Sequence, residues 1–186
     1  QPDRVTVVSP DKPGTFSRVA GVLSLYNMDV LGAEAHSDEQ GMAASEFRVS
    51  SQHGDIDWEP IENNLRLALS GRLALDSRLA DRAANARPRR ATSALAPAAP
   101  TVRFDDSASS NATFLEVRAP DMVGVLHRIT KAIADCGLDI RHARVLTLGN
   151  EVVDSFYVRE PNGGRINDEA YKNEISRAIL HSLGEK

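Results

Sequence analysis

The sequence has 186 residues, of which 41% are hydrophobic and 26% are charged, the balance of a soluble globular protein with one or two domains. The formal net charge of −4 gives no whole-chain attraction to nucleic acid, and no apolar run approaches the length that crosses a membrane. A single cysteine, Cys136, excludes a disulfide framework within the chain and fits a reducing compartment such as the cytoplasm. The chain begins at Gln1 without an initiator methionine, so we expect it to be a piece of a longer protein.

The chain opens with a predicted strand and helix joined by a tight turn. The β-branched residues 5–8 predict the strand, and the turn follows as Asp11-Lys-Pro-Gly14. Thr15 is the expected N-cap of the helix. Apolar side chains then recur at helical spacing, at Phe16, Val19, Ala20, Leu23 and Tyr26.

Two further strands and a second helix come next. Strands are predicted at 30–36 and 42–49 because both stretches are short, extended in pattern and bounded by turn residues. The second helix is expected to begin after Asp57, which can cap it. Its apolar pattern allows an extension past Gly71 to Leu79.

A change of composition divides the chain. Residues 83–100 are rich in Pro, Ala and Arg and show no amphipathic period, which predicts a linker. Residues 101–105 alternate again, and we assign them as the fourth strand of the first unit. The expected division is therefore a first domain at 1–110 and a second at 111–186.

The second part of the chain repeats the order of the first. It predicts a strand at 114–118 and a helix at 125–136. Strands at 140–148 and 151–158 flank Gly149-Asn150, a two-residue hairpin signal. A last helix carries a buried stripe of Tyr171, Ile175, Ile179 and Leu183.

An internal repeat links the two parts. Two similar segments each join a predicted strand to a predicted helix: Ser9-Pro-Asp-Lys-Pro-Gly-Thr-Phe16 and Ala119-Pro-Asp-Met-Val-Gly-Val-Leu126. Asp29 and Asp139 are separated by the same number of residues as these two segments. A repeat of this length indicates two copies of one fold unit. Each copy reads β-α-β-β-α, so we expect the α+β class, with two ferredoxin-like βαββαβ domains joined by a helix and the linker.

With Asp-x-x-Gly in its first turn, the unit resembles an ACT domain, a small regulatory module that binds amino acids. The second copy further resembles the C-terminal repeat of the bifunctional uridylyltransferase/uridylyl-removing enzymes of the PII nitrogen-signalling protein. The matching motifs are Asp121-Met-Val-Gly-Val-Leu126, Gly137-Leu-Asp-Ile140 and Asp154-Ser-Phe-Tyr-Val158, with Phe104-Asp-Asp-Ser-Ala-Ser-Ser110 upstream. The family's Arg-Pro is replaced by Met122-Val123, which loosens the transfer of ligand contacts to those two positions.

The resemblance implies a sensor without catalytic residues of its own. No nucleotidyltransferase signature with paired aspartates and no His-Asp phosphohydrolase motif is found in the sequence. By resemblance the ligand is glutamine, the partners are PII and the catalytic domains of the parent chain, and no cofactor is required. The same resemblance implies that the parent enzyme transfers and removes a uridylyl group, or an adenylyl group as in some members of the family.

The two copies of the turn are the candidate binding loops. Backbone N–H groups at a helix N-terminus favour a carboxylate, and an aspartate beside them can accept the ligand ammonium or a side-chain amide. We expect Asn27 and Asp29, at the start of the next strand, to close the other side of the first loop. The candidate ligand-binding residues are Asp11, Pro13, Gly14, Thr15, Phe16, Asn27, Asp29, Asp121, Val123, Gly124, Val125, Leu126 and Asp139. The alternative is that Asp11 and Asp121 only hydrogen-bond their own turns.

Two other points stay open at this stage. The five histidines lack the spacing of a metal site, so none is predicted. Asp154 shares its strand face with Val152 and Phe156 and belongs either to a structural polar network or to a ligand site. A pure interaction module, with no ligand and possible homodimers through sheet edges, is the alternative function.

Overall fold

The computed structural model describes residues 3–37, 40–51, 56–86 and 98–184. The strands are β1 Asp3–Pro10, β2 Met28–Ser37, β3 Met42–Ser51, β4 Thr101–Asp105, β5 Thr113–Pro120, β6 Asp139–Arg144, β7 Thr147–Leu148 and β8 Glu151–Arg159. The helices are α1 Thr15–Leu25, α2 Trp58–Leu69, α3 Leu75–Asn85, α4 Val125–Asp135 and α5 Glu169–Ser182. These elements confirm the α+β class.

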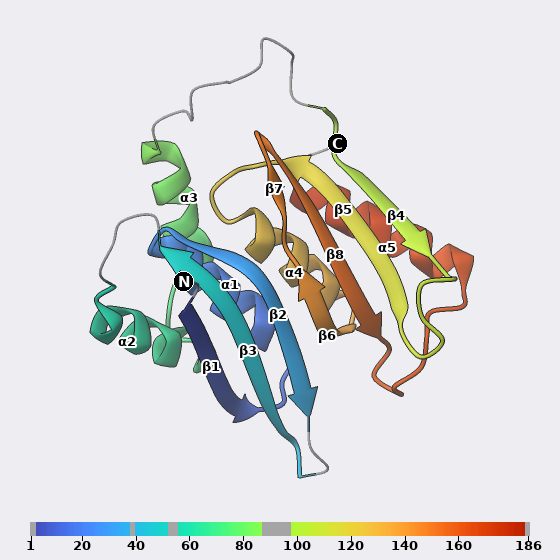
Figure 1. The fold of residues 1–186 in the computed structure, drawn as a ribbon, viewed down its shortest axis with the longest axis horizontal. Coiled ribbons are helices and arrows are strands. Elements are labelled where there is room, and N and C mark those ends of the chain that lie inside the picture. The colour runs from blue at the N-terminus through green and yellow to red at the C-terminus, as the bar shows by residue number, and fades with distance from the viewer. Residues whose placement is uncertain (1–2, 38–39, 52–55, 87–97, 185–186) are drawn as a thin grey trace.

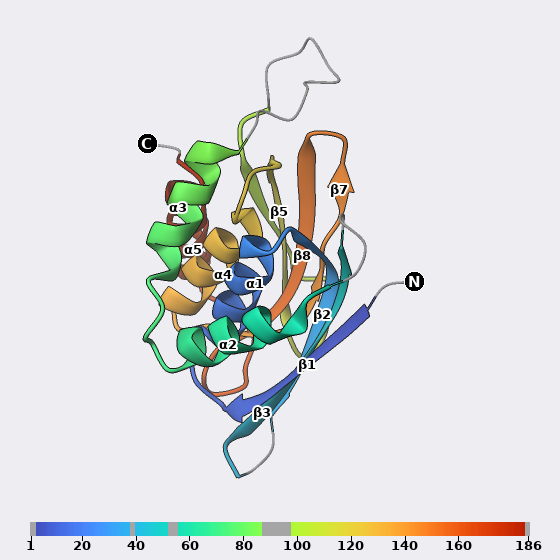
Figure 2. The ribbon, with the colours of Figure 1, turned by 90° about the vertical axis from the view of Figure 1, so that its left-hand side faces the viewer.

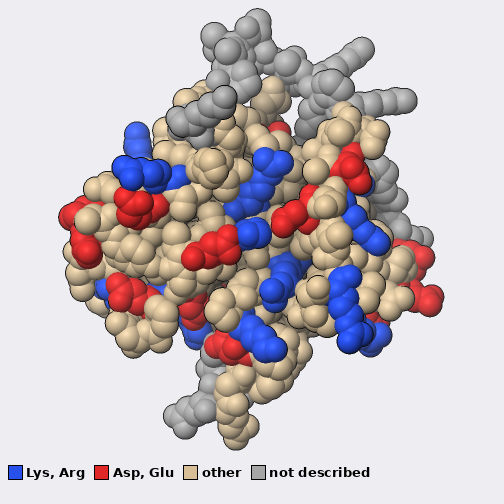
Figure 3. Space-filling view, turned by 180° about the vertical axis from the view of Figure 1, so that it is seen from behind, with Lys and Arg blue, Asp and Glu red and all other residues tan. Residues whose placement is uncertain are grey.

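The strands form one antiparallel sheet in the order β1-β3-β2-β6-β8-β5-β4, with β7 paired to β8 (Figure 1). The helices lie on one face of this sheet and leave the other face bare (Figure 2). The core between the layers includes the fully buried rings of Phe47 and Phe156, one from each half of the sheet. Lys and Arg side chains are interspersed with Asp and Glu over the helical face, which therefore presents no field of one sign (Figure 3).

The two halves join through one pair of strands. β2 and β6 pair through Gly32 with Arg144, Ala33 with Ala143 and Glu34 with His142. Above this seam, α1 packs against α4. Each half would otherwise expose an unpaired sheet edge at this point, so the seam covers two edges within one chain.

The two strand-to-helix turns that resemble each other in sequence also have similar backbone geometry at the start of α1 and α4. Gly14 and Gly124 precede the two helices with φ of 82° and 76°, in the left-handed region that glycine tolerates best. Thr15 is not the N-cap that we predicted, because it is already the first helical residue and its Oγ1 donates to the carbonyl oxygen of Lys12 at 2.9 Å. The N-cap position belongs to Gly14.

The strand at 101–105 does not complete the first unit, contrary to our assignment. β4 pairs with β5, at the outer edge of the second half. Asp106, the residue after β4, holds the strand there, because its carboxylate accepts hydrogen bonds from Lys172 of α5 at 2.7 and 2.9 Å. The same carboxylate raises the pKa of Lys172, whose side chain is only 5% exposed.

The expected extension of the second helix is also wrong. α2 ends before Gly71, whose φ of 72° breaks the helix, and α3 begins afresh at Leu75. α3 runs to Asn85 and so enters the segment predicted as linker. Residues 87–97 of that segment lie outside the described residues.

Candidate functional site

The first loop, residues 11–16, forms one wall of a cleft. The Asp11 N–H donates to the carbonyl oxygen of Gly41 at 2.9 Å, which ties the loop to the residue before β3. The Thr15 N–H donates to Lys12 at 3.2 Å and closes the turn. The cleft has a volume of about 380 Å³, and Ser45 of β3 contributes to its floor.

The other wall of this cleft comes from the second half of the chain. It is formed by residues 137–141 at the start of β6 and by Arg159 and Glu160 at the end of β8. We expected Asn27 and Asp29 to face the first loop, but neither lines this cleft, whereas Asp139, the counterpart of Asp29 in the other copy, does so. The reason is the antiparallel seam, which brings the start of β6 towards the loop before α1.

Both signs of charge line the cleft. Asp11 and Asp139 supply carboxylates, and Asp139 accepts a hydrogen bond from Arg141 at 2.9 Å. Arg159 also lines the cleft, and its buried Nε has no hydrogen-bond partner among the described residues. The N-terminus of α1 adds the partial positive charge of its backbone N–H groups. A zwitterion of amino-acid size therefore finds complementary charges here.

The second loop, residues 121–126, has the same backbone but a different cover. The Asp121 N–H donates to the carbonyl oxygen of Asn150 at 2.8 Å, as Asp11 does to Gly41 in the first copy. The Gly124 N–H, however, donates to the hydroxyl of Ser24 on α1 at 3.0 Å. The side chain of Leu79 lies over Gly124, with its methyl carbons 3.5 Å from where a Cβ would stand. α3 thus fills the space that is open in front of the first loop.

The remaining candidates follow from this arrangement. Asn27 accepts a hydrogen bond from Arg82 of α3 instead of lining the open cleft. Val123 is partly buried against the core, whereas Val125 and Leu126 are buried in α4. The structure therefore brings the loop at 11–16 together with Asp139 and keeps the loop at 121–126 behind α3.

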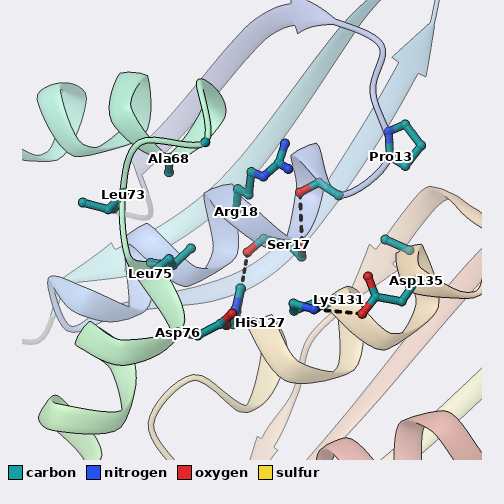
Figure 4. Close-up of a pocket in the computed structure, with 13 residues that line it drawn as sticks. Pro13, Ser17, Arg18, Ala68, Leu73, Leu75, Asp76, His127, Lys131 and Asp135 are labelled. Atoms are coloured by element: carbon teal, nitrogen blue, oxygen red, sulfur yellow. Dashed lines mark hydrogen bonds and ion pairs between the residues drawn. The ribbon is translucent and has the colours of Figure 1, made fainter.

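A second hollow lies on the helical side of the first loop, with a volume of about 340 Å³ (Figure 4). His127 of α4 projects into it between α1 and α3, with Nδ1 2.7 Å from the Ser17 carbonyl oxygen and Nε2 2.8 Å from Asp76 Oδ1. Lys131 and Asp135 form an ion pair of 2.8 Å on its rim (Figure 4). The sequence offered no sign of His127, because a histidine within a buried helical face has no characteristic neighbours.

Asp154 lies outside both spaces. Its side chain is fully buried on β8, and burial raises the pKa of its carboxyl group to about 7. The backbone N–H of Leu146 lowers this pKa in part, although neither carboxylate oxygen has a hydrogen bond of ordinary geometry among the described residues. Asp154 lines neither cleft and is enclosed within the second half of the chain.

The described residues contain no group of three or more His, Cys, Asp or Glu side chains arranged to hold a metal ion. A search of the same residues found no helix whose length and apolarity would let it cross a membrane.

Comparison with known proteins places these features in a family context. Residues 113–177 match the ACT domain family. The whole chain is similar to part of the bifunctional uridylyltransferase/uridylyl-removing enzyme of several bacteria. Identity is 33% with the Gluconobacter oxydans enzyme, over 96% of this chain and 19% of the relative, and 36% with that of Streptomyces coelicolor, over 95% of this chain and 22% of the relative.

Among solved structures, a protein from Galdieria sulphuraria aligns over 96% of this chain and 89% of its own, with 19% identity and a TM-score of 0.31. The present chain spans about a fifth of the length of the curated relatives that it matches. Residues 113–177 match an ACT domain and the chain corresponds to only one segment of these enzymes, in agreement with the expectation that this segment is not itself the enzyme. Residues 113–177 thus match the ACT domain family, and the chain as a whole is similar to one segment of the bifunctional uridylyltransferase/uridylyl-removing enzymes.

Proposed function

We propose that this chain is the glutamine-sensing segment of a PII-modifying enzyme, and that the cleft between the first loop and the start of β6 is its binding site. The observation that supports the proposal most directly is the pairing of residues 11–16 with Asp139 across one cleft of both charges. The names of the relatives add the nucleotidyl-transfer context.

The chemistry of the cleft suits a free amino acid. The ligand carboxylate takes the N–H groups at the start of α1, where Gly14 lets it approach the backbone. Asp11 and Asp139 accept from the ammonium group, which needs more than one acceptor because it has three donors. The amide of a glutamine side chain both donates and accepts, which suits a wall that carries Arg159 and Glu160.

Binding at this cleft gives a route for regulation. The two walls belong to different halves of the chain, so a ligand that contacts both favours one arrangement of the halves over others. In the parent protein this preference shifts the catalytic domains between attaching a nucleotidyl group to PII and removing it.

Calorimetric titration with L-glutamine tests the site, with Asp11→Ala and Asp121→Ala as a matched pair. Losing one charge-assisted hydrogen bond weakens binding by about tenfold to a hundredfold, so Asp11→Ala should show that loss. Asp121→Ala should leave the affinity unchanged, because its loop is covered by α3. If the folded chain without substitutions shows no binding of L-glutamine in the calorimeter, the proposal is wrong.

The bare face of the sheet favours a second candidate, an interaction module without ligand. This face carries exposed apolar side chains, among them Val8 at 66% and Leu31 at 39%. β1 and β4 also end the strand order within the described residues, which leaves two edges for homodimers. Sedimentation of the chain with and without L-glutamine separates the candidates: association that ignores glutamine favours the interaction module.

A further inference from the structure

The bare face of the sheet carries two arginines on either side of a glycine at the seam (Figure 1). Gly32 of β2 lies opposite Arg48 of β3 on one side and opposite Arg144 of β6 on the other. Opposed residues of antiparallel strands share one face of the sheet, and the neighbouring Phe47 and Ala143 are buried on the helical face. Both arginines therefore belong to the bare face, one from each half of the chain.

Gly32 supplies a floor without a side chain between the two arginines. A Cβ at this position would stand 3.0 Å from Nη2 of Arg48, so the guanidinium group of Arg48 lies over the glycine. Arg144 flanks the same glycine from the next strand, about 5 Å away across the sheet. Ser155 of β8 lies opposite Arg144 and adds a hydroxyl group to the row. An anion above Gly32 therefore meets hydrogen-bond donors on both sides.

The acidic side chains beside this row are engaged by other groups. Glu46 of β3 accepts a hydrogen bond from Arg4 at 3.2 Å. Glu34 of β2 directs one carboxylate oxygen to His142 at 3.6 Å and the other to His36 at 3.8 Å. Within the described part of the chain, the two arginines beside Gly32 form no ion pair and no side-chain hydrogen bond. Two guanidinium groups without a contacting carboxylate therefore face the same position.

We propose that Arg48 and Arg144 bind the phosphate group of a nucleotide above Gly32, at the seam between the two halves. A guanidinium group presents paired N–H donors whose planar geometry matches two phosphate oxygens. A terminal phosphate carries nearly two negative charges and three oxygens, so it satisfies two guanidinium groups at once. A carboxylate has one charge and two oxygens and satisfies one of them.

A row of aromatic rings beside the arginines favours a nucleotide as the carrier of the phosphate. Phe114, Tyr157 and His142 lie opposite one another on β5, β8 and β6, with successive ring centroids 5.3 and 5.9 Å apart. The three side chains are partly exposed on the bare face, two residues or about 7 Å along the strands from the arginine row. Nucleobases of any kind stack on such rings. The sugar of a nucleotide then spans the distance between the rings and the arginines.

The nucleotide site and the proposed glutamine cleft use different faces of the sheet. Ser45 contributes to the floor of the cleft and is buried on the helical side of β3. Arg48 follows three residues later on the same strand and therefore belongs to the bare side. Nucleotide binding at the seam thus stands whether or not glutamine binds in the cleft.

NMR titration of the full chain with uridine monophosphate, adenosine monophosphate and inorganic phosphate, at an ionic strength held constant with chloride, tests the site. Arg48→Gln and Arg144→Gln should each weaken all three ligands about tenfold, because each removes a charge-assisted contact. Tyr157→Leu should weaken the two nucleotides about tenfold and leave inorganic phosphate unchanged. Arg118→Gln is the matched control, since Arg118 lies on the same face but is paired with Glu116 at 2.9 Å.

The amide signals of β2, β3 and β6 report binding, and unchanged signals elsewhere show that each variant is folded. Losses in Arg48→Gln and Arg144→Gln, with full binding in Arg118→Gln, support the site. It is refuted if no ligand shifts these signals in the unsubstituted chain, or if Arg118→Gln weakens binding as much as Arg48→Gln does. Nucleotides that bind no more tightly than inorganic phosphate, with no effect of Tyr157→Leu, overturn the assignment of a nucleotide as the ligand.

Discussion

The two copies of the strand-to-helix loop have the same backbone conformation, but a ligand can reach only the first. In both, the glycine before the helix has a positive φ and the residue four positions later donates to its carbonyl oxygen, at 3.1 Å for Arg18 and 3.0 Å for Arg128. The first copy opens onto a cleft of about 380 Å³, whereas Leu79 lies over the second. Local sequence thus decides the shape of such a loop, and a helix from outside the repeat decides whether a ligand can reach it.

The same asymmetry extends to the sheet beneath the loops. Ser45 lies opposite Val7 in the first half, and Asp154 lies opposite Val117 in the second, at the equivalent position of the repeat. Ser45 contributes to the open cleft, while Asp154 is fully buried and lines neither space. A carboxyl group is therefore enclosed in the half whose loop is covered.

Among these predictions, the substitution of Asp154 should change the free energy of unfolding most. Its folded pKa of about 7 lies above the ordinary 3.8, so the neutral form stabilises the fold below about pH 4, and this contribution is lost as the pH rises through 7. Asp154→Asn should remove this loss and raise the free energy of unfolding at about pH 8 by up to about 4 kcal/mol. Urea unfolding of both proteins across pH measures it, and Asp154→Ser serves as control because it copies the first half. Parallel pH profiles for parent and variant would contradict the assignment.

Leu79→Ala should change both stability and access. Truncating a buried leucine costs about 2–3 kcal/mol at a peripheral helix, and here it also removes the side chain that covers Gly124. We expect glutamine stoichiometry to rise from one to two per chain in calorimetry. The matched control is Leu75→Ala, a leucine of the same helix that packs against Gly21 and leaves Gly124 covered. A stoichiometry of one in Leu79→Ala would show that more than this side chain closes the second loop.

The smallest effects should come from the two loop glycines, and they should match. An alanine at either position meets no backbone, since the nearest atoms are Ser17 Oγ at 3.7 Å for Gly14 and Leu79 at 3.5 Å for Gly124. The cost is then the positive φ alone, about 1–2 kcal/mol in each. Thermal unfolding of Gly14→Ala and Gly124→Ala measures it. Unequal costs would mean that the two backbones are not equivalent.

Local sequence patterns predicted the helices and strands, but they did not predict contacts between distant segments of the chain. The spacing of Phe16, Val19 and Leu23 places α1 because one helical face must be buried, and the repeat placed α4 by the same rule. The alternation in residues 101–105 fits the edge of either half, so it could not tell that β4 pairs with β5.

The candidate site was predicted in part for the same reason. The loop residues are local, and the sequence located them through the repeat. Asp139 faces the first loop only because β2 and β6 pair across the seam, and Arg159 joins it from the end of β8. No periodicity within either half encodes a contact between the halves. The helical pattern of α3 was predicted as an extension of the second helix, but nothing in it indicated that Leu79 covers the second loop.

The seam between the halves is three residue pairs long, and two of those pairs include Gly32 or Ala33. Because so short a strip carries few hydrogen bonds, the two halves also depend on the packing of α1 against α4 above it. The cleft takes one wall from each half. A ligand that fills the cleft would therefore add contacts between the halves that the seam itself does not supply.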